Sequence, residues 1–313
     1  MPQFQFGWHE DRKETDRIVA MLPNPLFVSA APDLMQDDPK DTWLWDVESS
    51  LFGETLPAHD QEIGDCVSHG WGRGVQDLLL TDAATAGNGF PGLIATEAIY
   101  ALSRVEIGGG RLRGDGSVGA WAADAARKFG FLLRKKYGRV DLTHYRGELA
   151  KAWGTTGLPD DLEPVAKEHP VRDVTLVTDI DQARVAIQNR FPIPVCSGQG
   201  FETVRQKGTG VCAPEGTWAH CMLVRAFLIL KDGRWVFTIQ QSWGESPTGP
   251  NRIELESGHV LTLPQGCFNV DADVLEAMFR KWQDSFAIAG LRGWERPAPL
   301  VFLGDSGGAN GFS

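Results

Sequence analysis

The stretch QEIGDC, residues 61–66, opens a long apolar run and decides how the first half of the chain is interpreted. Gly64 permits a sharp turn and Asp65 is a residue type that caps helices, so Cys66 is predicted in the first turn of a helix. A thiol there feels the positive end of the helix dipole, which favours the thiolate. Gln61 could donate its side-chain amide, beside the backbone N–H of Cys66, to an oxyanion.

A thiolate nucleophile needs an imidazole partner, and the second half of the chain offers one. His220 stands in GTWAHCMLV, at the expected start of an apolar strand. The next strand ends in QQSWG, where the Gln241 amide could accept from the imidazole and Trp243 could shield that contact from water. His69, one helical turn after Cys66, is the competing base, but it would point along the helix axis rather than across a cleft.

These motifs, in this order, resemble the papain family of cysteine peptidases. The family pattern is an oxyanion-hole Gln, Gly-Ser-Cys, His-Ala-Val and Asn-Ser-Trp-Gly, and His220 lies 154 residues after Cys66, near the family spacing of roughly 130–150. The segments GDGSVGAWAADAARKFGFL and DIDQARVAIQNRFPIPVCSG also resemble family segments, so the likeness covers residues 55–290. The resemblance implies that Cys66 is the nucleophile and His220 the base. It also implies that Gln61 is the oxyanion donor and Gln241 the orienting amide, with Gly64 and Trp243 at the substrate cleft.

The chain departs from the family pattern at four points. Gln241 replaces Asn, Gln61 lies five rather than six residues before the cysteine, and Asp65 replaces a small residue. The upstream segment is also far shorter than the family's inhibitory pro-region. These departures are typical of a distant bacterial or viral branch.

Composition limits the classes of partner. The 313 residues are 42% apolar and carry a net charge of −11, spread along the chain. This balance argues against nucleic acid and gives no reason to bind an anionic membrane. The first residues are too polar for a signal peptide, and no apolar run approaches the roughly 20 residues of a membrane span. The expected location is therefore cytoplasmic or virion-associated, and the oligomeric state is not predicted.

The five cysteines form no CxxC pair, so the usual zinc spacing is absent. An odd count without a secretion signal predicts free thiols in a reducing compartment. No metal and no cofactor is implied. Cys221, next to His220, is expected to point into the core from the opposite face of its strand.

Periodicity and turn residues predict helices followed by a mainly antiparallel sheet, an α+β arrangement with the two lobes of a papain-like fold. The expected domains are an N-terminal extension (1–54), a catalytic domain (55–298, with a helical lobe to about 170 and a β lobe over about 171–290) and a flexible tail (299–313). Helices are predicted over 10–22, 66–80, 93–105, 117–129, 181–190 and 271–282. Strands are predicted over 171–177, 193–197, 221–230 and 235–241, with a hairpin over 252–263.

The predicted function is hydrolysis of peptide bonds in a polypeptide substrate, through a Cys-His pair and an acyl-enzyme. Two alternatives remain open at this stage. One is an amidase or transferase that uses the same pair. The other is an inactive papain-like scaffold kept for binding or assembly, for example in a viral particle.

Overall fold

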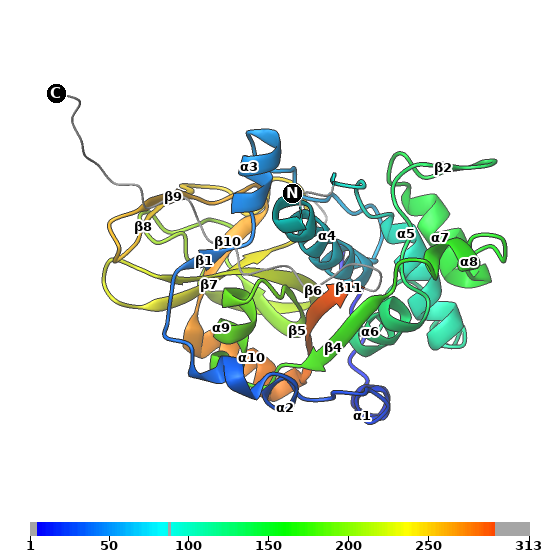
Figure 1. Ribbon diagram of the computed structural model, residues 1–313, viewed down its shortest axis with the longest axis horizontal. Coiled ribbons are helices and arrows are strands. Elements are labelled where there is room, and N and C mark those ends of the chain that lie inside the picture. The colour runs from blue at the N-terminus through cyan, green and yellow to red at the C-terminus, as the bar shows by residue number, and fades with distance from the viewer. Residues whose placement is uncertain (1–4, 87–88, 292–313) are drawn as a thin grey trace.

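The structure, a computed structural model, describes residues 5–86 and 89–291 (Figure 1). The predicted tail, 299–313, lies outside these residues. The helices are α1 (Arg12–Val19), α2 (Phe27–Ala30), η1 (Pro32–Gln36), α3 (Asp46–Phe52), α4 (Cys66–Ala86), α5 (Thr96–Ala101), η2 (Leu102–Ile107), α6 (Gly119–Lys128), α7 (Gly147–Thr156), α8 (Glu163–Ala166), α9 (Ile180–Gln188) and α10 (Ala272–Trp282). The strands are β1 (Thr42–Trp43), β2 (Lys136–Tyr137), β3 (Val140–Asp141), β4 (Val171–Leu176), β5 (Ile193–Phe201), β6 (Pro214–Ile229), β7 (Trp235–Gln240), β8 (Arg252–Glu254), β9 (Val260–Thr262), β10 (Cys267–Asp271) and β11 (Asp284–Leu291).

One large sheet organises the second half of the chain. Its strand order is β10-β7-β6-β5-β11-β4, with β1 added to β6, and the pairs are antiparallel. Most of the helices that precede β4 gather on one side of the sheet, and α9 and α10 lie below it in Figure 1. The predicted α+β class is therefore confirmed.

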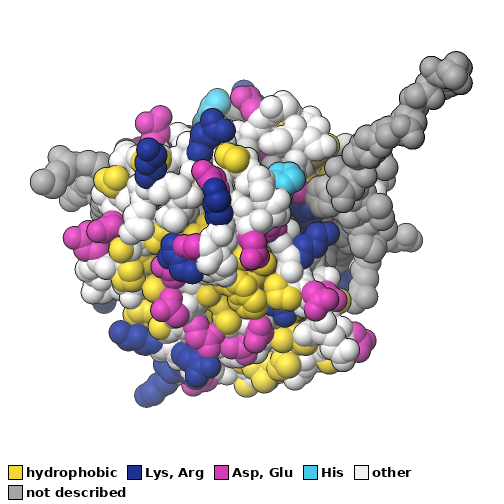
Figure 2. Space-filling model, turned by 90° about the vertical axis from the view of Figure 1, so that its left-hand side faces the viewer, with side chains coloured by type: hydrophobic (Ala, Val, Ile, Leu, Met, Phe, Trp, Pro, Cys, Tyr) yellow, Lys and Arg dark blue, Asp and Glu magenta, His cyan; other side chains and the backbone are white. Residues whose placement is uncertain are grey.

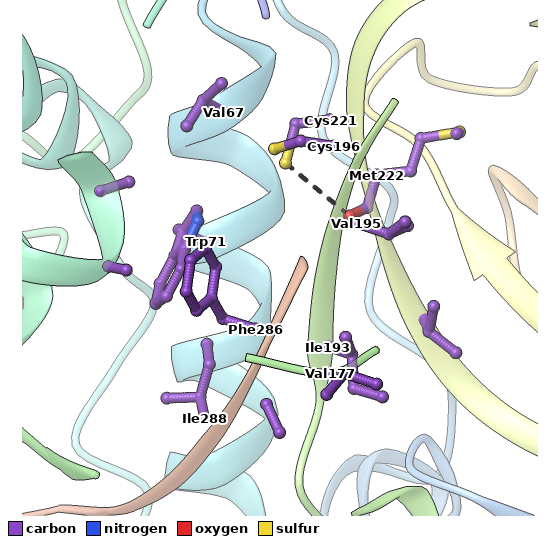
Figure 3. Packing of buried hydrophobic residues seen from close by; sticks show 14 of the residues in the cluster. Val67, Trp71, Val177, Ile193, Val195, Cys196, Cys221, Met222, Phe286 and Ile288 are labelled. Atoms are coloured by element: carbon purple, nitrogen blue, oxygen red, sulfur yellow. Dashed lines mark hydrogen bonds between the residues drawn. The ribbon is translucent and has the colours of Figure 1, made fainter. Parts of the chain in front are cut away.

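Helix α4 lies against this sheet, because Gly70 and Gly74 give it a narrow surface on that side. A Cβ at Gly70 would lie 3.1 Å from the Cys221 sulfur, and one at Gly74 would lie 3.0 Å from Ile288. On another face, a Cβ at Gly72 would meet Thr96 at 2.8 Å. Each glycine costs roughly 1 kcal/mol of helix propensity. Close packing of α4 on strands β6 and β11 and helix α5 offsets that cost (Figure 3).

The strands near the site are longer than the sequence predicted. Strand β6 begins at Pro214, so His220 lies within the strand rather than at its start. Strands β10 and β11 were not predicted at all, because each is short or lies directly beside a helix signal. Residues 23–60, for which no helix or strand was predicted, contain α2, η1, β1 and α3.

Two helices begin one or two residues after the start of their predicted ranges, 117–129 and 271–282. Helix α6 begins at Gly119, and Ser117 does not cap it, because its hydroxyl donates to Ser103 at 3.0 Å. Asp271 precedes α10 without a side-chain capping bond. The helix expected over 93–105 is split into α5 and a π-helical turn, η2.

A buried ion cluster joins α3, α4 and β6. The Arg225 guanidinium donates to both Asp77 oxygens, at 2.7 and 2.8 Å, and to Gln240 Oε1 at 3.0 Å. Glu48 accepts from both Arg225 and Arg73. Because all four charges are nearly inaccessible to solvent, removal of one partner would leave the others uncompensated.

On the face shown in Figure 2, acidic and basic side chains are interspersed around a patch of apolar ones. This face carries no concentrated field of one sign. No helix among the described residues is long and apolar enough to cross a bilayer.

Candidate active site

Cys66 is the first residue of α4 and is fully buried. Its Sγ accepts a hydrogen bond from the backbone N–H of Cys221 at 3.4 Å. Since Cys221 follows His220 on β6, the candidate nucleophile meets the sheet one residue from the candidate base. Burial raises the pKa of the Cys66 thiol well above its usual range, and the nearby Cys221 thiol adds to this.

His220 is also fully buried, and neither ring nitrogen has a hydrogen-bond partner among the described residues. The imidazole stacks on the Trp243 indole, with ring centroids 4.2 Å apart and planes 22° apart. Burial lowers the pKa of His220 to about 3, and the neighbouring His69 contributes in the same direction. In this state the two groups are therefore a neutral thiol and a neutral imidazole.

The N-terminal segment, residues 5–9, covers both groups. The Gln5 carbonyl accepts from Gln61 Nε2 and from Trp243 Nε1, each at 3.1 Å. Further along, the Gly7 N–H donates to the Ala219 carbonyl at 3.1 Å. These contacts span the helical side and the sheet side of the site.

Packing around Gly7 leaves no spare room. A Cβ at Gly7 would lie 1.8 Å from the Gly64 carbonyl oxygen, and one at Gly64 would lie 2.4 Å from the Phe6 carbonyl oxygen. The Phe6 ring meets the His220 imidazole edge-on, at 6.4 Å between centroids. Ser117 N–H donates to the Gly7 carbonyl at 2.8 Å and completes the attachment. Gly64 is thus in close backbone contact with residues 6 and 7.

The two candidate amides make other bonds. Gln61 Nε2 donates to Gln5 and to the Ile63 carbonyl (2.8 Å), while its Oε1 accepts from the Ser242 hydroxyl at 2.5 Å. Gln241 Nε2 donates to the Ser246 carbonyl at 2.7 Å, and its buried Oε1 has no partner among the described residues. Gln61 is therefore bonded to the N-terminal segment, whereas Gln241 is bonded to a neighbouring loop rather than to His220.

Asp65 and His69 form a polar cluster beside the nucleophile, which the sequence did not reveal. Asp65 Oδ2 accepts from the Tyr145 hydroxyl at 2.9 Å, and Oδ1 lies 3.3 Å from His69 Nε2. The other His69 nitrogen lies 3.1 Å from His59 Nδ1. His69 is thus engaged with Asp65 and His59, and no hydrogen bond joins it to Cys66. No group of three or more His, Cys, Asp or Glu side chains suited to a metal ion occurs in 5–86 or 89–291.

Comparison with known proteins agrees with this geometry at the level of the fold. No family model and no curated protein sequence matches the chain. Among solved structures, it is similar to xylellain, a cysteine protease from Xylella fastidiosa, with a TM-score of 0.53 and 15% identity over 93% of this chain and 95% of that one. It is also similar to procathepsin B S9 from Trypanosoma congolense, with a TM-score of 0.51 and 10% identity over 91% and 86% of the two chains.

The chain therefore has the two-lobed α+β fold of papain-like cysteine proteases. Identity of this size establishes the fold, whereas activity has to be argued from the site itself.

Proposed function

We propose that this chain is a cysteine-type peptidase in which Cys66 is the nucleophile and His220 the acid and base. The contact between α4 and β6 carries the proposal. There the thiol at a helix N-terminus accepts the N–H of Cys221, the residue that follows the histidine, at 3.4 Å. A helix N-terminus and an imidazole are the two features that activate a cysteine for nucleophilic attack.

In the proposed reaction, the Cys66 thiolate forms a bond to the carbonyl carbon of a peptide, and the carbonyl oxygen becomes an oxyanion. The Cys66 backbone N–H and the Gln61 amide would donate to that oxyanion. The His220 imidazolium then protonates the leaving amine as the C–N bond breaks, which leaves an acyl-enzyme. Water attacks the acyl carbon, His220 accepts its proton, and the C–S bond breaks to release the Cys66 thiolate.

The contacts of the N-terminal segment support a polypeptide substrate. The groups that hold it are Gln61, Trp243, Ala219 and Ser117, and they bind its backbone amides and carbonyls. Such groups bind any extended chain, whatever its side chains. Because the segment leaves Cys66 and His220 without solvent exposure, the described state is closed, and substrate can enter only after residues 5–7 move.

One observation favours a second candidate, an inactive scaffold with this fold. His220 has no hydrogen-bonded partner to orient it among the described residues, and Gln241 is bonded to Ser246. An imidazole without an orienting partner is a poorer base.

Peptide hydrolysis tests the proposal. The chain and its Cys66→Ser and His220→Ala variants are incubated with an unfolded protein, and new peptide ends are identified by mass spectrometry. Cys212→Ser serves as a matched control, because Cys212 is also a buried free thiol but has no part in the proposed reaction. We expect cleavage by the unmodified chain and the control only. Cleavage by Cys66→Ser would contradict the proposal. If neither the unmodified chain nor any variant cleaves the protein, the inactive scaffold is favoured.

A further inference from the structure

The turn that carries Cys66 is held from one side by the segment that leads into α7. Tyr145 provides a single hydroxyl that bonds twice: it donates to Asp65 Oδ2 at 2.9 Å and accepts from the Glu62 N–H at 3.3 Å. Two residues later, the Gly147 N–H donates to Glu62 Oε2 at 2.8 Å. A Cβ at Gly147 would lie 2.7 Å from Glu62 Cβ, so the two segments are in direct contact.

His69 lies beside the same carboxylate on the helix side, close to it but without a hydrogen bond to it. Its Nε2 lies 3.3 Å from Asp65 Oδ1, and its Nδ1 lies 3.1 Å from His59 Nδ1. The Tyr145 ring packs edge-on against the His69 ring, with centroids 4.8 Å apart. The result is a chain of polar contacts, Tyr145–Asp65–His69–His59, that is nearly closed to solvent at its centre.

This arrangement has an unusual consequence for Asp65. An aspartate directly before a helix usually caps it by accepting from the first free N–H groups. Here only the Asp65 backbone carbonyl serves α4, accepting from the N–H groups of Ser68 at 2.9 Å and His69 at 3.3 Å. Neither carboxylate oxygen accepts from an N–H of α4 among the described residues, since Oδ2 is bonded to Tyr145 and Oδ1 faces His69.

We propose that Tyr145 and His69 are positioning residues for Cys66. Tyr145, through its hydrogen bond, and His69, by occupying the space beside Oδ1, keep the Asp65 carboxylate away from the N-terminus of α4 and leave the positive end of that helix to the Cys66 sulfur. The proposal rests on the proposed function, because it explains how a chain with an acidic residue directly before its nucleophile keeps that nucleophile active. Without the two partners, the carboxylate would turn to cap α4, and its charge would oppose the thiolate at close range.

The test is the pH dependence of Cys66 alkylation in the full chain. Iodoacetamide is applied from pH 5 to 10 and labelling at Cys66 is followed by peptide mass. Tyr145→Phe is compared with Asp65→Asn and with the double variant. The control is Tyr137→Phe, because the Tyr137 hydroxyl also donates and accepts, at Leu133, away from the site.

We expect Tyr145→Phe to raise the midpoint of alkylation by about one pH unit, because the freed carboxylate both caps the helix and repels the thiolate. With Asn at position 65, adding Tyr145→Phe should leave the midpoint where Asp65→Asn puts it, and Tyr137→Phe should match the unmodified chain. A purely structural role for Tyr145 would lower the melting temperature without this dependence on Asp65.

The proposal is overturned if Tyr145→Phe leaves the midpoint unchanged, or raises it equally with Asp or Asn at position 65. If Tyr145→Phe does not fold, His69→Leu is measured instead, with Asp and with Asn at position 65. It should raise the midpoint of alkylation with Asp at position 65 and leave it unchanged with Asn there. Peptide hydrolysis by the unmodified chain is scored separately. Hydrolysis with no change in the midpoint refutes only the positioning role, whereas a shifted midpoint without hydrolysis refutes only the peptidase.

Discussion

Substitution of Gly7 by alanine should open the site while the chain keeps its full length. The new Cβ would lie 1.8 Å from the Gly64 carbonyl oxygen, far inside van der Waals contact. The clashing atom belongs to the backbone, so no side-chain rotation relieves the overlap, and residues 5–7 have to lift. Trp8, which is buried and donates from its indole to Asp284 at 2.8 Å, should remain in place.

The size of the effect follows from the bonds that the segment loses. Gln5 and Gly7 make four hydrogen bonds in the closed state, to Gln61, Trp243, Ala219 and Ser117. If two of them are lost at about 1 kcal/mol each, the open population increases by about 30-fold.

Opening also restores solvent to His220, whose pKa burial holds at about 3 against its usual 6.5. Release of that shift favours the imidazolium by about 5 kcal/mol.

The assay is the rate of Cys66 alkylation at pH 7, followed by peptide mass. Gly7→Ala should label about 30-fold faster than the unmodified chain if the rate follows the open population. Gly89→Ala is the matched control, because no atom lies within 4 Å of the added Cβ, and it should label at the original rate. Equal rates for Gly7→Ala and the unmodified chain would refute the view that residues 5–7 close the site.

Two further predictions concern stability and are checked by urea denaturation. Burial raises the pKa of Asp284 to about 6 from 3.8, against the opposing bonds from Trp8 and Gly119. The folded state therefore binds the proton more tightly, so this group's contribution to stability grows as pH falls through 6 and is lost as pH rises. Relative to the unmodified chain, Asp284→Asn should therefore become more stable by about 2.5 kcal/mol on going from pH 4 to pH 8. An equal difference at both pH values would contradict this. Arg225→Met should lower the free energy of unfolding by about 3–5 kcal/mol, because it leaves buried carboxylates without their cation. Arg234→Met removes an exposed ion pair and should cost less than about 1 kcal/mol. Similar losses for both variants would show that the buried cluster contributes no more to stability than the exposed pair.

The parts of the site that could be predicted from sequence are those with local signals. The turn before Cys66 and the apolar strand around His220 can each be predicted from a few adjacent residues. The helix at Cys66 forms despite three glycines because packing on the sheet compensates for their poor propensity. The orienting role of Gln241 stays a prediction, since its amide is bonded to Ser246 in this structure.

The missed parts depend on pairs that are far apart in sequence. Gly7 meets Ala219 and Tyr145 meets Asp65, and nothing near either residue indicates its partner. The one available signal for the N-terminal segment was a glycine between two aromatic residues, which is typical of a close backbone approach. Arg225 likewise interrupts an apolar strand, and a buried charge of this kind implies buried partners elsewhere in the chain.

The most direct test of the central claim is whether Cys66 and His220 act as a pair. Alkylation is measured at pH 6 in the Gly7→Ala background, with and without His220→Ala. The account predicts rapid labelling of Cys66 that His220→Ala reduces by at least about tenfold, because the thiolate loses its imidazolium partner. Labelling that is no faster than that of a free thiol, or that His220→Ala leaves unchanged, would contradict it.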